Sequence, residues 1–216
     1  MAKLEWDKVS EHYYETGVDR GVLYPYGTNS YGDGVAWNGL TAVNEQPSGA
    51  EENAQYADNI KYLSLRSAEE FGVTIEAFTY PDEFAQCDGS VEVVPGVVIG
   101  QQTRKSFGLC YRTVYGNDTE GNDYGYKLHI VYGLTASPSE KSYQTINDSP
   151  EAIQFSWETK SVPVPVEGHK PTSQFTIDST KTPKAKLEAL EAVLYGSEQT
   201  EPRLPEPTEL ITLLTA

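Results

Sequence analysis

The chain has 216 residues, 38% of them hydrophobic, and a formal net charge of -16 at pH 7. That length is enough for one domain with a full core, as in many all-β sandwiches and barrels. The acidity argues against a nucleic-acid-binding protein, because phosphate contacts need Lys and Arg. The sequence has no apolar run near the ~20 residues of a membrane-spanning helix and no apolar signal-peptide core at its start, so we expect a cytoplasmic location and no membrane partner.

The first predicted strands cover residues 34–45, 58–67 and 69–80. The last two are separated by little more than Ala68, which predicts a hairpin between them. The segment between the first two, EQPSGAEENAQYA (45–57), is polar and acidic and has no apolar period. Its Pro-Ser-Gly favours a turn over a continuation of the strand. We therefore expect a long loop here, and such loops in compact domains are usually functional or mobile.

Three later segments alternate apolar and polar side chains, as strands with one buried face do. Residues 105–115 and 124–136 are joined by the turn-rich GNDTEGND and predict a second hairpin, and residues 151–160 predict a further strand. The expected apolar faces are Phe107, Leu109, Tyr111 and Tyr115 in the first segment, Tyr126, Leu128, Ile130, Tyr132 and Leu134 in the second, and Ile153, Phe155 and Trp157 in the third.

Two helices are predicted. In TPKAKLEALEAVLYG (182–196), Thr182 can cap the helix, Pro183 suits its first position and Gly196 can end it. The apolar stripe of this helix consists of Leu187, Leu190 and Leu194. A shorter helix is expected within YPDEFAQCDG (80–89), which starts at a proline and stops at a glycine. After Gly196, three prolines predict an extended tail whose apolar end needs a surface to cover.

These elements together predict a mainly β fold, a sandwich or barrel with one or two packed helices. Cys87 and Cys110 fit a reducing compartment and are expected as small buried side chains. The three histidines have no spacing typical of a metal site or a catalytic triad. The acidic DTEGND at 118–123 lacks the later bidentate Glu of a calcium loop, and a hairpin turn explains it better. We expect no metal and no cofactor.

A group of carboxylates along residues 67–89 raises the question of an acid–base site. A glycosidase needs two carboxyl groups facing each other across a cleft. Glu76 is expected mid-strand on the face shared by Thr74 and Phe78, whereas Asp82 and Glu83 are expected where a helix starts, and there they complement its dipole. We therefore expect structural or solvated carboxylates rather than catalytic ones. The group consists of Glu69, Glu70, Glu76, Asp82, Glu83 and Asp88.

Three long stretches, taken in order, carry a family resemblance. They are residues 34–89 (GVAWNGLTAVNE through DEFAQCDG), 106–113 (SFGLCYRT) and 123–158 (DYGYKLHIVYGLTA through EAIQFSWE). Together they resemble the major tail proteins of long-tailed bacteriophages, especially those infecting Gram-positive bacteria. The resemblance covers about residues 20–180 and then the helix, and it involves whole segments rather than one short motif.

The resemblance implies a tail-tube-like β-sandwich or barrel with one flanking α-helix. It implies a tail tube domain over residues 1–196, with an N-terminal arm over 1–19, followed by an extended proline-rich tail over 197–216. Such subunits form hexameric rings that stack around the tape measure protein into a tube of the virion tail, assembled in the host cytoplasm. DNA passes through the tube without specific binding, and the tail terminator and distal tail proteins are further partners. The family has no catalytic activity.

The resemblance also gives the polar segment at 45–57 an expected role, because a long loop after an early strand commonly reaches the next ring. The residues expected in this inter-ring loop are Glu45, Gln46, Pro47, Ser48, Gly49, Glu51, Glu52, Asn53 and Gln55. The alternative is a carbohydrate-binding or carbohydrate-cleaving β-sandwich, since the chain has 15 tyrosines and three tryptophans that could stack on sugar rings.

Overall fold

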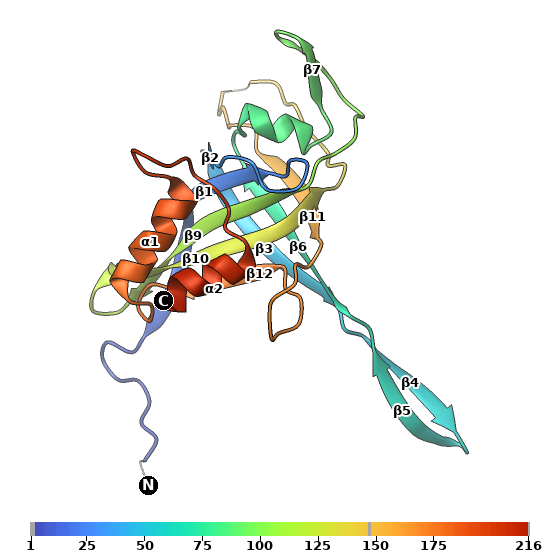
Figure 1. Ribbon diagram of the computed structural model, residues 1–216, viewed down its shortest axis with the longest axis vertical. Helices are drawn as coiled ribbons and strands as arrows, with labels where there is room; N and C mark the ends of the chain where they lie inside the picture. Colours follow the sequence, from blue (N-terminus) through green and yellow to red (C-terminus); the bar gives the residue numbers. More distant parts are fainter. Residues whose placement is uncertain (1–2, 147, 216) are drawn as a thin grey trace.

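The protein is built from a strongly bent antiparallel sheet that two helices cover on one side (Figure 1). The computed structural model describes residues 3–146 and 148–215. The predicted fold class, a mainly β sandwich with a flanking helix, is confirmed, although the structure has two α-helices.

Eight strands form the main sheet: β1 (Tyr13–Pro25), β2 (Val35–Trp37), β3 (Leu40–Gly49), β6 (Glu69–Ala77), β9 (Phe107–Asn117), β10 (Gly121–Ala136), β11 (Phe155–Ser161) and β12 (Gln174–Asp178). Two hairpins stand outside this sheet, namely β4 (Glu52–Ala57) with β5 (Ile60–Arg66), and β7 (Val91–Val94) with β8 (Val97–Ile99). The helical segments are the 3-10 helix η1 (Asp82–Gln86), α1 (Lys184–Tyr195) and α2 (Pro207–Thr215).

The order of the main sheet is β2-β1-β9-β10-β11-β6-β3, and β12 also pairs with β10. The predicted β9–β10 hairpin is confirmed. The predicted hairpin between residues 58–67 and 69–80 is wrong, because β5 pairs with β4 and β6 pairs with β3. The chain therefore runs out through β3 and β4 and returns through β5 and β6.

The long strand β10 changes partner along its length. Its middle pairs with β12, from Lys127 to Val131, and its end pairs with β11 from Leu134 onward. Between them Gly133 has φ +63°, which only glycine adopts at low cost, and its carbonyl accepts a hydrogen bond from Val162 N–H at 3.0 Å. This bulge moves Leu134 to the face opposite Leu128, so the prediction that Leu134 shares the face of Leu128 is wrong.

Two apolar clusters lie on the two sides of the β1–β9–β10 layer. The inner cluster fills the space between this layer and β11–β6; its largest member is Trp157, which packs with Trp37 and Phe84. The outer cluster lies under α1 and α2, and there the hydroxyl of Tyr24 donates to the Leu194 carbonyl at 2.6 Å. Both faces of the central strands are therefore buried. The alternation of apolar and polar side chains predicts only one buried face for each strand.

The helical predictions are largely confirmed. Leu187, Leu190 and Leu194 are buried, and α1 ends at Gly196 with φ +79°. The expected capping by Thr182 is wrong, because Pro183 is at the N-cap position and α1 has no side-chain cap hydrogen bond. η1 provides the expected short helix at 82–86.

Both predicted ends of the chain need correction. Residues 207–215 form α2 rather than extended chain, because Pro207 opens a helix whose Leu210 is buried under the outer cluster. At the other end, β1 starts at Tyr13, so the described part of the expected 1–19 arm is limited to residues 3–12.

We predict that Gly133→Ala lowers the free energy of unfolding by roughly 2–5 kcal/mol, measured by denaturant titration of the monomer. The left-handed backbone costs an L-residue about 1–2 kcal/mol. An added Cβ would also lie 2.4 Å from the Val162 carbonyl oxygen, and such overpacking costs about 1–3 kcal/mol.

Gly168→Ala is the matched control, because Gly168 has φ +75° but open space around its Cβ position. It should lose only the backbone contribution, about 1–2 kcal/mol. Equal losses in the two variants would mean that the β10 bulge is not sterically fixed.

Candidate functional site

The segment expected to be a loop is an extended two-stranded structure. Glu45 to Gly49 belong to β3 and pair with β6, and Glu52 to Ala57 form β4. The prediction that Pro47, Ser48 and Gly49 form a turn is wrong. Proline is tolerated at this position because β3 is an edge strand of the sheet. The loop expected at 45–57 is thus one side of a hairpin that extends from the body of the molecule (Figure 1).

We call residues 52–66 the arm. Its two strands are joined at Asp58 and Asn59, whose φ values of +50° and +62° are typical of a tight type I′ turn. Cross-strand partners share a face, and the pairs Asn53–Leu65, Gln55–Leu63 and Ala57–Ile60 place three apolar side chains on one face. The other face includes Glu52, whose carboxylate binds Lys61 and Ser64. The arm thus has one mainly apolar face, and a second face that carries these polar groups together with Ala54 and Tyr56. Both faces are in water.

The arm is joined to the body through a weak connection. Regular pairing of β3 with β6 ends at Gly49–Glu69, and that of β4 with β5 starts at Glu52–Arg66. Between them are two long hydrogen bonds of 3.3 Å, from Ala50 N–H to the Ala68 carbonyl and from Ser67 N–H to the Glu51 carbonyl. Ala50 has φ +54°, an uncommon conformation for a residue with a side chain. Because regular strand pairing is interrupted at this joint, the arm projects from the core as a separate element.

At its base the hairpin is fixed to the opposite layer through Glu45. The Tyr111 hydroxyl donates to Glu45 Oε1 at 2.6 Å, and the His129 Nδ1 atom lies 3.5 Å from the same oxygen. The His129 imidazole stacks on the Tyr111 ring with 4.7 Å between centroids. The contact with His129 is the largest cause that lowers the pKa of Glu45; burial opposes it, and the Tyr111 hydroxyl lowers the pKa further. Glu45 is thus a structural anchor at the root of the extension, not a loop residue.

Two further projections were not singled out from the sequence as functional. The upper hairpin, β7–β8, turns at Pro95–Gly96 between two valine runs, a hairpin signal that the sequence contains. Its apolar side chains are exposed. The N-terminal segment, residues 3–12, exposes Leu4, Trp6 and Val9. It is held at its root by Asp118, which accepts from Ser10 N–H at 3.2 Å.

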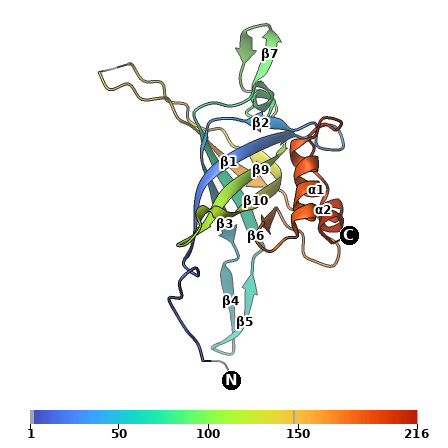
Figure 2. The same cartoon turned by 90° about the vertical axis from the view of Figure 1, so that its left-hand side faces the viewer.

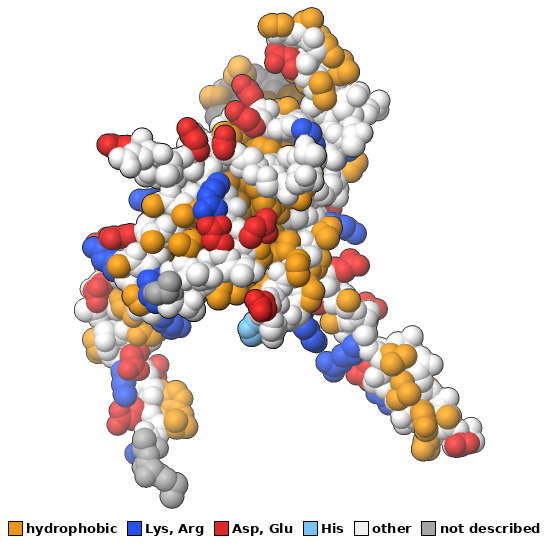
Figure 3. All heavy atoms as spheres, in the orientation of Figure 1, with side chains coloured by type: hydrophobic (Ala, Val, Ile, Leu, Met, Phe, Trp, Pro, Cys, Tyr) orange, Lys and Arg blue, Asp and Glu red, His pale blue; other side chains and the backbone are white. Residues whose placement is uncertain are grey.

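The projections lie at opposite ends of the molecule. Both views place the upper hairpin at one end of the long axis, and the arm and the N-terminal segment at the other (Figures 1 and 2). Hydrophobic side chains gather on all three projections in the space-filling view (Figure 3). On the arm, Tyr56, Ile60, Tyr62 and Leu65 are all more than half exposed. Apolar residues are therefore exposed at both ends of the molecule.

The carboxylates of residues 67–89 do not converge on a cleft. Glu76 is on the face with Thr74, as predicted, and accepts from Gln154 Nε2 at 2.8 Å. Asp88 is buried and pairs with Lys141 Nζ at 2.5 Å. Glu69 and Glu70 are exposed at the start of β6, and Asp82 and Glu83 are exposed at the start of η1. Each carboxylate thus has a structural partner or faces solvent.

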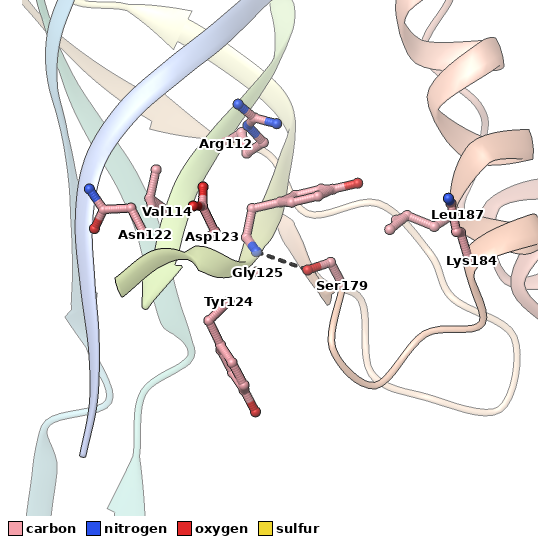
Figure 4. Close-up of a pocket in the computed structure, with 10 residues that line it drawn as sticks. Arg112, Val114, Asn122, Asp123, Tyr124, Gly125, Ser179, Lys184 and Leu187 are labelled. Carbon is pink, nitrogen blue, oxygen red and sulfur yellow. Dashed lines mark hydrogen bonds between the residues drawn. The ribbon is translucent and has the colours of Figure 1, made fainter. Parts of the chain in front are cut away.

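A pocket of about 500 Å³ lies between the end of the β9–β10 hairpin and α1 (Figure 4). Figure 4 shows Asn122 to Gly125 on one side and Lys184 and Leu187 on the other, with Ser179 accepting from Tyr126 N–H at 2.8 Å. Arg112 is already engaged, because its guanidinium forms two hydrogen bonds with Asp19 and lies 4.9 Å from the centre of the Tyr126 ring. The pocket contains no nucleophile paired with a base.

Cys87 and Cys110 are buried free thiols, and burial raises the pKa of each to about 12. The described residues include no group of three or more His, Cys, Asp or Glu side chains arranged to hold a metal ion. Among the helices that the structure describes, none is both long enough and apolar enough to cross a membrane.

Comparison with known proteins adds no assignment: no family model matches the chain, and no curated protein matches it.

We predict that Glu45→Gln lowers the free energy of unfolding at pH 7 by about 1–3 kcal/mol, as expected for a hydrogen bond to a charged group. The pKa of Glu45 lies below its ordinary value of 4.5 in the folded protein. Its ionised form therefore contributes stability that is present above pH 4.5 and is lost as the pH falls through the lower folded value. The difference between variant and wild type should shrink toward zero as the pH falls below 4.5.

Chemical denaturation at a series of pH values measures this difference. Glu70→Gln serves as the control, because Glu70 is exposed on the neighbouring strand. A wild-type advantage that is the same at pH 7 and at about pH 3 would show that the ionised form of Glu45 does not anchor the base of the hairpin.

Proposed function

We propose that this protein is a structural subunit that assembles with copies of itself into stacked hexameric rings, forming the tail tube of a long-tailed bacteriophage. The resemblance to major tail proteins, which covers about residues 20–180 and then the helix, supports the proposal. The observation that carries it is the exposure of apolar residues on unsupported hairpins at opposite ends of one subunit.

A free two-stranded hairpin is at best marginally stable in water, because it has no layer to pack on. The arm has no third strand, and its apolar face carries Ile60, Leu63 and Leu65. Contact with another subunit would bury this face and compensate the entropy of ordering, about 1–2 kcal/mol per residue for the backbone. The arm's exposed strand edges are open to further pairing.

The placement of the projections favours a head-to-tail assembly. The arm and the upper hairpin are different surfaces, so a contact that uses both is heterologous and repeats from one copy to the next. Contacts of this kind form closed rings or open filaments. In a stack of rings, the contacts around the tube close into a ring, and the contacts along the tube repeat from one ring to the next.

The proposed partners follow from this role. They are other copies of the chain, the tape measure protein inside the tube, and the tail terminator and distal tail proteins at its ends. DNA passes through the lumen without specific binding, and a net charge of -16 favours passage without adhesion. The proposed location is the virion tail.

We also propose that the protein is not an enzyme. The carboxylates of residues 67–89 are assigned to structure and surface, since Glu76 and Asp88 already bind neighbouring side chains. The exposed Tyr56 and Tyr62, which could stack on sugars, lie on the arm, and we assign them to assembly rather than to carbohydrate binding.

Electron microscopy of purified full-length protein over a concentration series tests the proposal. Wild type should form rings or tubes with a central channel. A variant with Leu63→Ser and Leu65→Ser should assemble at least tenfold less readily, because the apolar face of the arm becomes polar. Its thermal unfolding should match that of wild type, since the arm contributes no residue to either apolar cluster.

The matched control carries Ala54→Ser and Ser64→Thr, which lie opposite each other on the other face of the arm. It should assemble like wild type. If wild type remains a 23.9 kDa monomer at every concentration, the proposed function is wrong. If the Leu63/Leu65 variant forms tubes at wild-type yield, self-assembly stands but the arm is not a stacking element.

A further inference from the structure

We propose that Trp6 of the N-terminal segment inserts into an apolar pocket formed by β1, β2 and the end of α1 in a second copy of the chain. This inference rests on the self-assembly proposed above and assigns to it a specific contact outside the arm. It joins the most exposed tryptophan of the described chain to a cavity that has no occupant within its own subunit.

The pocket has a volume of about 410 Å³, a size that small-molecule sites commonly have. Its walls are mostly apolar: Gly21, Val22, Ala36, Pro202 and the ring of Tyr195. Gly21 adds no side chain to the pocket, and Leu40 occupies the space that a Cβ there would take. Arg20 lies at one side, with its guanidinium 5.9 Å from the centre of the Tyr195 ring.

Trp6 is unlike the other two tryptophans. It is 76% exposed, whereas Trp37 is 2% exposed and Trp157 is fully buried in the inner cluster. Leu4 and Val9 on either side are exposed to a similar extent. An indole is the side chain that gains most from burial. Three such residues on one short segment indicate a ligand for another surface rather than a solvated end.

The anchor and the course of the segment favour an occupant from another copy. The segment is anchored at Ser10 beside Asp118, next to the start of β1, where Tyr13 pairs with Asn117. Four extended residues, from Ser10 to Trp6, span at most about 14 Å. The pocket lies at Arg20, roughly 20 Å along β1 from Tyr13. The strand bulges twice on the way, and Asp19 stands opposite Arg112, five residues from the Asn117 partner of Tyr13. To reach its own pocket, Trp6 would have to fold back along β1 with the segment fully extended while the anchor at Ser10 holds.

The direction of the N-terminal segment also agrees with an occupant from another copy. In both views it leaves the body and runs away from it at the lower end, while β2 lies in the upper half (Figures 1 and 2). A copy stacked along the long axis therefore brings one subunit's segment toward the next subunit's pocket. The same head-to-tail relation follows from the arm and the upper hairpin.

The charges beside the two surfaces are complementary. Asp7 follows Trp6, and its side chain is 92% exposed. Arg20 is exposed at the side of the pocket, and the salt bridges found among residues 3–146 and 148–215 do not include it. An inserted Trp6 brings Asp7 to the rim of the pocket, where Arg20 can pair with it. An apolar ring between two acidic residues, Glu5 and Asp7, thus meets an apolar cavity beside one basic group.

Tryptophan fluorescence of the full chain, followed through assembly, tests the contact, because the other two tryptophans are buried throughout. The Trp6 emission should shift to shorter wavelength, and its quenching by acrylamide should fall at least threefold as rings or tubes form. Trp6→Ala should raise the concentration needed for half-maximal assembly at least tenfold. Trp6→Phe should recover part of that loss. Tyr143→Ala, at another exposed aromatic residue, should have no effect.

Cross-linking identifies the partner surface. A double variant with Glu5→Cys and Ala36→Cys, treated with a short bis-maleimide, should give a ladder of dimers, trimers and longer chains. Each single variant should give none, and the native thiols are buried. If wild type assembles while Trp6 remains open to quenching, or the double variant gives no ladder, the contact is wrong although self-assembly stands. Burial of Trp6 in the monomer would equally contradict it. Absence of assembly at any concentration overturns the proposed function, and this contact with it.

Discussion

The exchange of partners along β10 is the constraint on which the architecture depends. Gly133 adopts a left-handed backbone at the point where β12 ends its pairing and β11 begins. One layer can therefore pack under the helices and also curl back over the inner cluster. Without this bulge, Leu134 would point toward α1 and α2, and β11 with its partner β6 would lose the pairing that joins them to β10. The β3–β6 pair, and the hairpin that extends from it, follow from that turn of the sheet.

The body and its projections obey different energetics. The body buries both faces of its central strands, and buried tyrosine hydroxyls donate to carbonyls of the C-terminal segments, as Tyr132 does to Pro205 at 2.8 Å. The arm, the upper hairpin and the N-terminal segment bury almost nothing, yet each carries exposed apolar side chains. A chain with a net charge of -16 stays dispersed through repulsion, so association needs specific apolar contacts to overcome it. The projections are the places where such contacts are available.

Elements that obey local rules could be predicted from the sequence, and those set by distant partners could not. The β9–β10 hairpin and α1 were predicted because their turn residues and the stripe of Leu187, Leu190 and Leu194 are local signals. The loop expected at 45–57 is a strand because an exposed hairpin needs no apolar alternation, only a partner, which β5 and β6 supply. The prolines after Gly196 predict extended chain where α2 forms, although proline suits a first helical position. Glu45 is among the site residues predicted from the sequence, but its hydrogen bond with Tyr111 depends on how the layers fold together. The exposure of Trp6 could be seen only in the structure.

The central claim is that the arm is an assembly element ordered by a second copy of the chain. Hydrogen exchange of the backbone amides in residues 52–66, followed from dilute to concentrated protein, measures this most directly. We expect fast exchange of the arm amides in the dilute monomer and strong protection once assemblies form, while amides of β9 and β10 stay protected at every concentration. Arm amides that exchange equally fast in monomers and in assemblies would contradict it, as would arm amides that are already protected in the dilute monomer.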